Sequence, residues 1–556
     1  MSTILPDVNF NVLDGGLDLA PNLSGGVAGV IGQSSIGDVL PHVVTSAGQI
    51  AALFGTGALA RVLRDALEAG AQALVACRVS SIGGVPGAAA APVRTRSAIG
   101  IGGFTPGETN TSPVPIIMSA NCNLPGLLEF KVTTGGSASE GEVSWRFAGG
   151  AWHAPMPMGD AVFDFAGGSS VVVMFVDGTY VIDDTWSVLA VEGGTGTLTA
   201  SGAPAADAVI DVEILTGGGR NGGTYRLTVD GVVVTAAATI PVNGQVVVQG
   251  LCTLLFTEGE AEPHFVDGDI WRVVCSGPVT GVEEIAAAAL KIRAAGLPVE
   301  CIYVAGATSP STWAALDVLA ETEFKAKGRF MFFMAEAADV ADGQSEAAWV
   351  LARVAEPVIA GSLHRVAVCA GYVGEGEERR SSGGRVLGHV MGLAKVSFSP
   401  GRVRSGSIGG VTVFGPTDEG IIAQLDIAGF ITLRRWEGLS GAYVTNGRML
   451  VDETSDFRWL EYRRVMDRAC RDARLAGLSS AHDEGDVTGL KALESDMQVP
   501  LDRLVGARLC AGATVVVPID QDVVGTSTVA ASVSIQPIPA MRWINVDIGF
   551  TRGDAA

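Results

Sequence analysis

Short apolar runs alternate with amphipathic segments in two separate parts of the chain. Val27–Ile31 and Ala73–Val79 are apolar throughout, which is typical of strands buried on both faces of a sheet. Between them, apolar residues recur at helical spacing over Ala58–Ala69, and Gly70 follows as a helix stop. The same rhythm returns three times after Gly281, which predicts a mixed α/β fold with parallel strands.

The later part of this pattern predicts three helices, each followed by a short apolar strand: 282–295 and 299–304, 309–325 and 329–334, 344–360 and 365–370. The block at 27–79 is too small to hold a core alone, so we expect it to share one discontinuous α/β domain with the later block. The predicted organisation is an N-terminal arm, a first core part, an inserted surface domain, a second core part and a C-terminal arm: 1–20, 21–95, 96–280, 281–510 and 511–556.

An internal repeat lies inside the predicted insertion. Tyr180–Val188 and Phe265–Val273 share an aromatic residue, Val, Asp, Trp and Val at matching positions. Short alternating strands with glycine turns around each copy predict two β-sandwich-like modules, about 124–195 and 206–278. Trp186 and Trp271 are expected to be core anchors. Asp184 and Asp269 are expected to cap turns, with metal binding as a weaker alternative.

The C-terminal segment alternates apolar and polar residues twice, as strands do. One face of the first stretch carries Val529, Ala531, Val533 and Ile535, and one face of the second carries Ile544, Val546, Ile548 and Phe550. Pro537–Ala540 between them predicts a hairpin turn. Because an isolated hairpin is only marginally stable in water, it must pair with a sheet, either in its own subunit or in another.

Composition narrows the function classes. The 556 residues carry a net charge of −22, which argues against a nucleic-acid partner or an anionic membrane surface. No apolar run reaches the roughly 18 residues of a membrane span, and the N-terminus lacks a signal-peptide pattern. We therefore expect a protein made in the cytoplasm, with no membrane insertion.

Motifs of common enzymes do not occur in the sequence. There is no phosphate-binding G-x-x-x-x-G-K-[ST] loop, no G-x-S-x-G elbow and no H-E-x-x-H pair. The eight cysteines form no Cys-x-x-Cys pair, so a zinc site is not expected. No cofactor is expected either. The expected protein is not an enzyme, although an α/β enzyme with a β insertion stays open as an alternative.

An arginine-rich helix is predicted over 456–475 in this otherwise acidic chain. Trp459, Tyr462, Met466, Ala469 and Ala473 fall on one stripe and are expected to face the core, whereas Arg464, Arg468 and Arg471 fall on another side. This second side is either a solvated face balanced by nearby carboxylates or a docking surface for an acidic partner.

The order of short motifs resembles the contractile tail sheath family of phage tails, pyocin-like particles and type VI secretion sheaths. The matching pieces are Gly32–Gly37, Val44–Ser46, Leu53–Gly55, Glu68–Ala71 and Arg78–Val79, then Gly447–Arg448 and Trp459 with Arg463–Arg464. Met449 stands where Thr is common, the spacing after Trp459 is shorter, and Pro500 is expected to break the final helix. The resemblance covers about 21–95 and 280–550, and leaves the insertion outside it.

This resemblance implies a structural and mechanical subunit. It implies hexameric rings stacked in a helical sheath around a tail tube, with baseplate and tail terminator proteins as further partners and no nucleotide. The sheath would assemble in the host cytoplasm, become part of a virion tail and contract to drive the tube through a cell envelope. A non-contractile virion structural protein is the remaining alternative.

Three site predictions follow from the resemblance. The C-terminal hairpin would add strands across subunits, together with extended residues 4–14 of a neighbour. Arg464, Arg468 and Arg471 would dock on the tail tube. After lysis, exposed thiols of neighbouring subunits, with Cys122 and Cys510 as the candidates, would pair as an inter-subunit disulfide.

Overall fold

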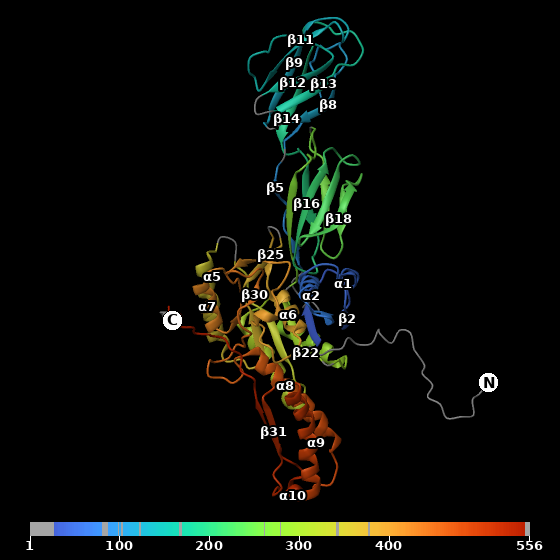
Figure 1. Ribbon diagram of the computed structural model, residues 1–556. Helices are drawn as coiled ribbons and strands as arrows, with labels where there is room; N and C mark the ends of the chain where they lie inside the picture. Colours follow the sequence, from blue (N-terminus) through green and yellow to red (C-terminus); the bar gives the residue numbers. More distant parts are fainter. Residues whose placement is uncertain are drawn as a thin grey trace, which may run out of the picture. The chain divides into compact units, whose positions relative to one another are not determined.

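The computed structural model describes residues 27–79, 87–97, 99–101, 104–121, 124–165, 169–260, 262–278, 280–297, 299–340, 344–375 and 378–550. The chain divides into two compact units (Figure 1). The first unit comprises Met1–Gln33, Gly37–Ser80 and Thr280–Ala556, and the second comprises Ser34–Ile36 and Ser81–Val279. Several sheets and helices build the chain, which confirms the predicted mixed α/β class. The predicted N-terminal arm, residues 1–20, lies outside the described residues.

A seven-stranded sheet organises the first unit. In sheet order its strands are β2 (His42–Val44), β3 (Leu74–Arg78), β1 (Val27–Gly32), β22 (Val299–Ala307), β23 (Phe332–Glu336), β24 (Val366–Cys369) and β28 (Phe430–Ile431). Every neighbouring pair is parallel except β2 with β3. β1 pairs with β3 on one side and with β22 on the other. Strands that come before and after Ser81–Val279 in the sequence are therefore neighbours in one sheet.

Helices cover both faces of this sheet, and each face has its own apolar core. Ala28 and Val30 of β1 pack with α1 (Ala47–Phe54), α2 (Ala58–Glu68) and α6 (Gly383–Gly392). Val27 and Ile31 pack with the opposite layer, which holds α3 (Val282–Ala294), α4 (Pro310–Lys327), α5 (Glu346–Ala360) and α7 (Glu419–Ile427). Side chains of a strand alternate between the faces, so a strand buried on both sides is apolar throughout.

Local signals set the helix boundaries close to where the sequence predicts them. The side chain of Ser309 accepts a hydrogen bond from the Thr312 amide and Pro310 opens α4, a favourable start for a helix. Gly328 ends this helix at φ 58°, a left-handed conformation that glycine adopts without steric cost. The predicted alternation of helices and strands after Gly281 is confirmed.

Small sheets complete this part of the first unit. β25 (Tyr372–Glu375) pairs with β26 (Glu378–Ser381) and with β27 (Thr412–Gly415), and β29 (Leu433–Arg434) pairs with β30 (Tyr443–Val444). Residues 430–434 therefore form two short strands in different sheets. A 3-10 turn spans Val403–Ser405.

The second unit contains two β-sandwich modules with the same strand order. The first module has a sheet ordered β11-β10-β9-β14-β6, with β7 on β14, facing a sheet ordered β12-β13-β8. Its strands are β6 (Ile99–Ile101), β7 (Thr105–Pro106), β8 (Ile116–Asn121), β9 (Gly126–Thr134), β10 (Glu142–Phe147), β11 (Met156–Pro157), β12 (Asp160–Phe165), β13 (Ser169–Met174) and β14 (Thr185–Glu192).

The second module repeats this plan, with a sheet ordered β18-β17-β16-β21-β4, β5 on β21, and a sheet ordered β15-β20-β19. Its strands are β4 (Ala88–Ala89), β5 (Val93–Arg96), β15 (Thr197–Ser201), β16 (Ala208–Thr216), β17 (Thr224–Val229), β18 (Val232–Thr239), β19 (Gln245–Val248), β20 (Cys252–Thr257) and β21 (Ile270–Ser276). Trp186 and Trp271 are buried in the two cores, which confirms their prediction as anchors.

The repeated aspartates hold connecting segments. Asp184 accepts hydrogen bonds from the amides of Thr111 and Ser112 and from the Ser112 hydroxyl, and these bonds lower its pKa against the opposing effect of desolvation. Asp269 accepts one from the Gly194 amide at 3.1 Å. Both residues thus bind backbone at the edge of a module, as the turn-capping prediction requires. Within the described residues no cluster of three or more metal-ligating side chains occurs.

The chain ends in α8 (Leu460–Ser479), α9 (Val487–Gly506), β31 (Gly512–Val516), α10 (Val523–Thr526) and β32 (Ser532–Gln536). The prediction that Pro500 breaks a helix is wrong, because α9 continues through it. Leu501 and Leu504 after the proline are buried in the local core, and this packing offsets the lost backbone hydrogen bond. Among the helices of the described residues, none is both long and apolar enough to cross a membrane.

Candidate subunit-interface site

The C-terminal part of the first unit is a small helix-on-sheet layer. We use C-terminal hairpin for β31 and β32, which pair antiparallel from Gly512–Gln536 to Val516–Ser532. α8, α9 and the hairpin share an apolar core in which Ala469, Leu501 and Val515 are buried. Val533 and Ile535 of β32 pack against this core from the other strand. Figure 1 shows the hairpin beside the two helices.

The outer edge of β31 is closed by side chains of α9. The Gln498 side-chain amide donates to the Ala513 carbonyl at 3.0 Å, and its oxygen accepts from the Val515 amide at 2.8 Å. The Glu494 carboxylate accepts from the Val517 amide at 2.8 Å. These bonds satisfy backbone groups that an edge strand otherwise presents to other chains. No further strand can pair on this side without displacing α9.

The outer edge of β32 is open. Because Ala513 and Val515 point their backbone groups away from β32, their cross-strand partners Ile535 and Val533 point theirs away from β31. No partner for these N–H and C=O groups is found among the described residues. An unpaired strand edge is a template for another strand. The hairpin therefore has one edge available for strand addition, and it is the β32 edge.

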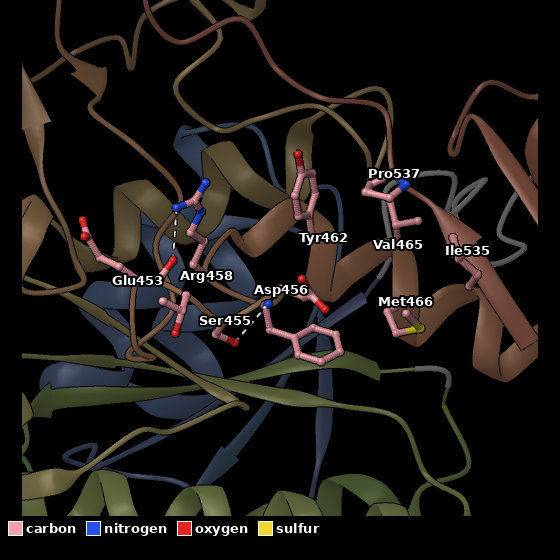
Figure 2. A pocket seen from close by; sticks show the side chains of 11 residues that line it. Glu453, Ser455, Asp456, Arg458, Tyr462, Val465, Met466, Ile535 and Pro537 are labelled. Atoms are coloured by element: carbon pink, nitrogen blue, oxygen red, sulfur yellow. Dashed lines mark hydrogen bonds between the residues drawn. The ribbon is translucent and has the colours of Figure 1, made fainter.

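A cavity of about 770 Å³ lies beside this open edge. Ile535 and Pro537 line it from the hairpin side, and Val465 and Met466 line it from α8. Figure 2 shows these four side chains gathered at one side of the cavity, with Glu453 and Arg458 of the 453–458 loop at the other. A strand added to β32 would have space and apolar surface for its side chains here.

The chain after the hairpin pairs with no sheet. Residues 541–550, which we call the tail, contain no helix or strand. The side chains of Ile544, Val546, Ile548 and Phe550 are exposed, Ile548 to 92%. Four large apolar side chains at alternate positions, all in water, are costly unless another surface covers them. The tail therefore has the pattern of a strand but no sheet of its own.

One residue anchors the tail to its own subunit. The Arg542 guanidinium pairs with the Glu461 carboxylate and lies over the Trp459 ring, 3.5 Å from its centroid. Burial raises the pKa of Glu461, and the positive charge of Arg542 acts against that rise. Arg448 lies over the same indole at 4.5 Å and pairs with Asp426 at 2.7 Å. The motif residues Arg448 and Trp459 thus meet at the point where the tail leaves the subunit.

The sequence predicted a hairpin between 529–536 and 542–550, and this prediction is wrong. β32 pairs with β31 rather than with 542–550, because Pro537 and Pro539 do not turn the chain back on itself and β31 offers a strand at hand. Val529, Val533 and Ile535 pack into their own subunit, and Ala531 is exposed. Of the eight predicted arm residues, Ala531 and the four in the tail are exposed.

The three arginines predicted to dock on a tube do not form one exposed surface. Arg464 is fully buried, pairs with Glu300 and donates to the Val390 carbonyl at 3.0 Å. Arg471 is half-buried and donates to the Phe330 carbonyl at 3.3 Å, and exposed Arg468 pairs with Asp472 on its own helix. The assignment of Arg464 to a docking surface is wrong. Its side chain holds α8 against the main sheet instead.

The thiol candidates differ from the prediction as well. Cys510 is 2% exposed and belongs to the hairpin core, and burial raises the pKa of its thiol. The expectation of an exposed thiol there is wrong, since a leucine-rich core surrounds it. Cys122 lies outside the described residues, and its pairing stays a prediction.

Sequence reasoning missed Glu494, Gln498 and Arg542. The spacing of Glu494 and Gln498 was a partial signal, because residues four apart on a helix lie on the same side of it. Nothing in their pattern says that this side faces a strand edge. Arg542 directly precedes the alternating residues of the tail. A single positive charge at that position was the only sign in the sequence that the start of the tail is anchored.

These features define a mixed α/β protein with a repeated β insertion and an unpaired C-terminal tail. The chain belongs to the DUF2586 family: the model of the DUF2586 N-terminal domain matches residues 5–448, and that of the DUF2586 C-terminal domain matches residues 456–553. No curated protein sequence matches the chain.

Three solved structures are similar to the chain. A chain of the anti-feeding prophage baseplate has 17% identity and a TM-score of 0.39, covering 50% of this chain and 76% of that one. A chain of the contracted sheath complex of the extracellular contractile injection system PVC has 15% identity and a TM-score of 0.38, covering 48% and 74%. The sheath tail protein of Listeria innocua has 10% identity and a TM-score of 0.40, covering 92% and 95%.

Proposed function

We propose that this protein is the structural subunit of a contractile tail sheath. Subunits would stack as hexameric rings around a tail tube, meet baseplate and tail terminator proteins at the ends, and contract without a nucleotide. The sheath-like motif order supports this proposal. The observation that supports it most directly is that one chain has both an open strand edge at β32 and an unpaired strand-like tail.

Strand addition between copies would satisfy both features at once. The tail of one copy would pair with the β32 edge of the next, and its apolar face would enter the cavity lined by Val465, Met466 and Ile535. The tail and the edge are different surfaces, so the contact is heterologous and generates rings or helical filaments rather than closed pairs. Such links hold while rigid parts rotate between two packings.

The test compares two truncations by electron microscopy. The full chain is expected to form long hollow cylinders. Removal of 541–556 is expected to give a folded chain that forms none, with a melting temperature lowered only slightly by the loss of the Arg542–Glu461 pair. Removal of 526–556 also deletes β32 and exposes the hairpin core, so it is expected to lower the melting temperature as well.

The alternatives give different images. Discrete globules from the full chain at every concentration would favour an enzyme of the same fold class. Cylinders that never shorten would favour a non-contractile structural role. Cylinders from the chain lacking 541–556 would contradict the assigned contact while leaving the sheath function standing.

A further inference from the structure

Two cysteines of the second module lie in facing sheets. Cys252 opens β20 in the three-stranded sheet, and Cys275 lies on β21 in the larger sheet. Both are buried in the same apolar core, at 5% and 2% exposure. Each thiol shifts the pKa of the other, and both side chains belong to one core, so the two cysteines are neighbours.

The two strands oppose each other along their inward-facing rows. On β20 the row is Cys252, Leu254 and Phe256, and on β21 it is Trp271, Val273 and Cys275. At one end Phe265 bridges the rows, with ring centroids 5.5 Å from Phe256 and 6.0 Å from Trp271. The thiols lie at the other end. The sandwich thus holds its two sheets together with aromatic rings at one end and with a pair of thiols at the other.

The first module shows what this position needs for packing alone. Its equivalent rows are Val171, Val173 and Phe175 on the β13 side and Trp186, Val188 and Ala190 on β14. All six are buried, and all but Ala190 belong to one apolar core. Val171 and Ala190 occupy the places of Cys252 and Cys275. Two ordinary apolar side chains therefore fill this site in the sister module, and the thiols bring chemistry that packing does not require.

We propose that Cys252 and Cys275 form an intramolecular disulfide that joins the two sheets of the second module once the protein meets a low-molecular-weight disulfide such as oxidised glutathione. The structure holds the pair in its reduced form. This inference does not depend on sheath assembly. It concerns other cysteines than the inter-subunit pairing predicted for Cys122, which stays a separate prediction.

The reaction has two steps, and each cysteine takes part in one of them. The thiolate of one cysteine attacks oxidised glutathione, displaces one glutathione thiolate and forms a mixed disulfide. The sulfur of the other cysteine then displaces the second glutathione thiolate. The oxidant takes up two electrons and two protons and leaves as two thiols.

Peptide mapping tests the link directly. Trypsin cuts after Arg226, Arg272 and Lys291, so each cysteine lies on its own peptide, 227–272 and 273–291. The folded full chain is incubated with oxidised glutathione, alkylated and digested without reductant. The expected result is one covalently joined pair of these peptides. A link seen only after unfolding in urea, or two alkylated cysteines in the oxidised folded protein, overturns the proposal.

A stability measurement with a matched variant separates the disulfide from packing. Oxidation is expected to raise the melting temperature of the second unit by on the order of 10 °C, because the loop between the cysteines is closed in the unfolded chain. The Cys252→Val and Cys275→Ala double variant carries the residues of the first module. It is expected to fold and to melt at the same temperature with and without oxidant. An equal shift in this variant would contradict the assignment.

Discussion

Two strand-like segments near the C-terminus, β32 and the tail, share one pattern and have opposite fates. Both alternate apolar and polar residues. Val533 and Ile535 of β32 meet a partner strand and a helix core in their own chain. Ile544 and Val546 of the tail meet neither and lie in water. Alternation thus specifies a strand that needs a partner, and the fold decides whether the same chain supplies it.

The same contrast holds for the arginines of α8. Arg464 has its partners inside the subunit, whereas Arg468 extends into solvent and pairs only along its own helix. The sequence places both on one helical side. Burial of Arg464 depends on Glu300, which is 164 residues away and at the start of β22.

Substitution of Arg464 and of Arg468 is expected to give the largest measurable difference between a buried and an exposed residue of α8. Arg464→Ala leaves Glu300 buried without its partner and is expected to cost about 3–5 kcal/mol in the free energy of unfolding. Arg468→Ala is expected to cost less than about 1 kcal/mol, because its pair with Asp472 is exposed. Urea unfolding of both variants measures the difference. Similar costs for the two would mean that Arg464 is not a core residue.

A pair of proline substitutions tests the direction of the open edge. The Val533 amide points away from β31, so Val533→Pro is expected to keep the hairpin, lower stability by about 1 kcal/mol and abolish assembly. The Ser534 amide points toward Thr514, so Ser534→Pro removes a hairpin hydrogen bond and is expected to unfold this layer. Circular dichroism and sedimentation velocity report the two effects. Normal assembly of the Val533→Pro variant would exclude the β32 edge.

Acidification is the smallest predicted effect and concerns the tail anchor. Arg542 lowers the pKa of Glu461 when it is docked, so the docked state binds fewer protons than the released state. The tail is therefore fully anchored above the pKa of Glu461 and is released as the pH falls through that pKa. Burial raises this pKa, so the release is expected at a higher pH than for an ordinary glutamate. Hydrogen exchange in 543–550 is expected to quicken there.

Glu461→Gln mimics this release at neutral pH. Trypsin is expected to cut after Arg542 roughly five-fold faster in the variant, which corresponds to the loss of a contact worth about 1 kcal/mol. Glu453→Gln, in an exposed loop of the same neighbourhood, is the control and is expected to leave the rate unchanged. Equal rates in all three proteins would mean that Glu461 does not hold the tail.

Much of the fold was predictable because its elements are defined locally. The apolar strands at 27–31 and 299–304 and the helices between them carry their own periodicity, and the matched tryptophans located both module cores. The candidate site was predictable only in part. Which edge is open depends on Gln498 and Glu494 reaching β31 from another helix, and the burial of Arg464 depends on a distant carboxylate. Local patterns do not contain such contacts.

Cysteine cross-linking between two differently marked copies tests the central contact most directly. One copy carries Ser534→Cys on the open strand, and the other carries Asn545→Cys or Asp547→Cys on the polar face of the tail, all in a Cys122→Ser background. Oxidation of the mixture is expected to give a heterodimer with at least one of the tail positions. Thr514→Cys, the partner of Ser534 on the closed strand, is the control and is expected to give none. A mixture that yields no heterodimer from Ser534→Cys, or as much from Thr514→Cys, would contradict strand addition at β32.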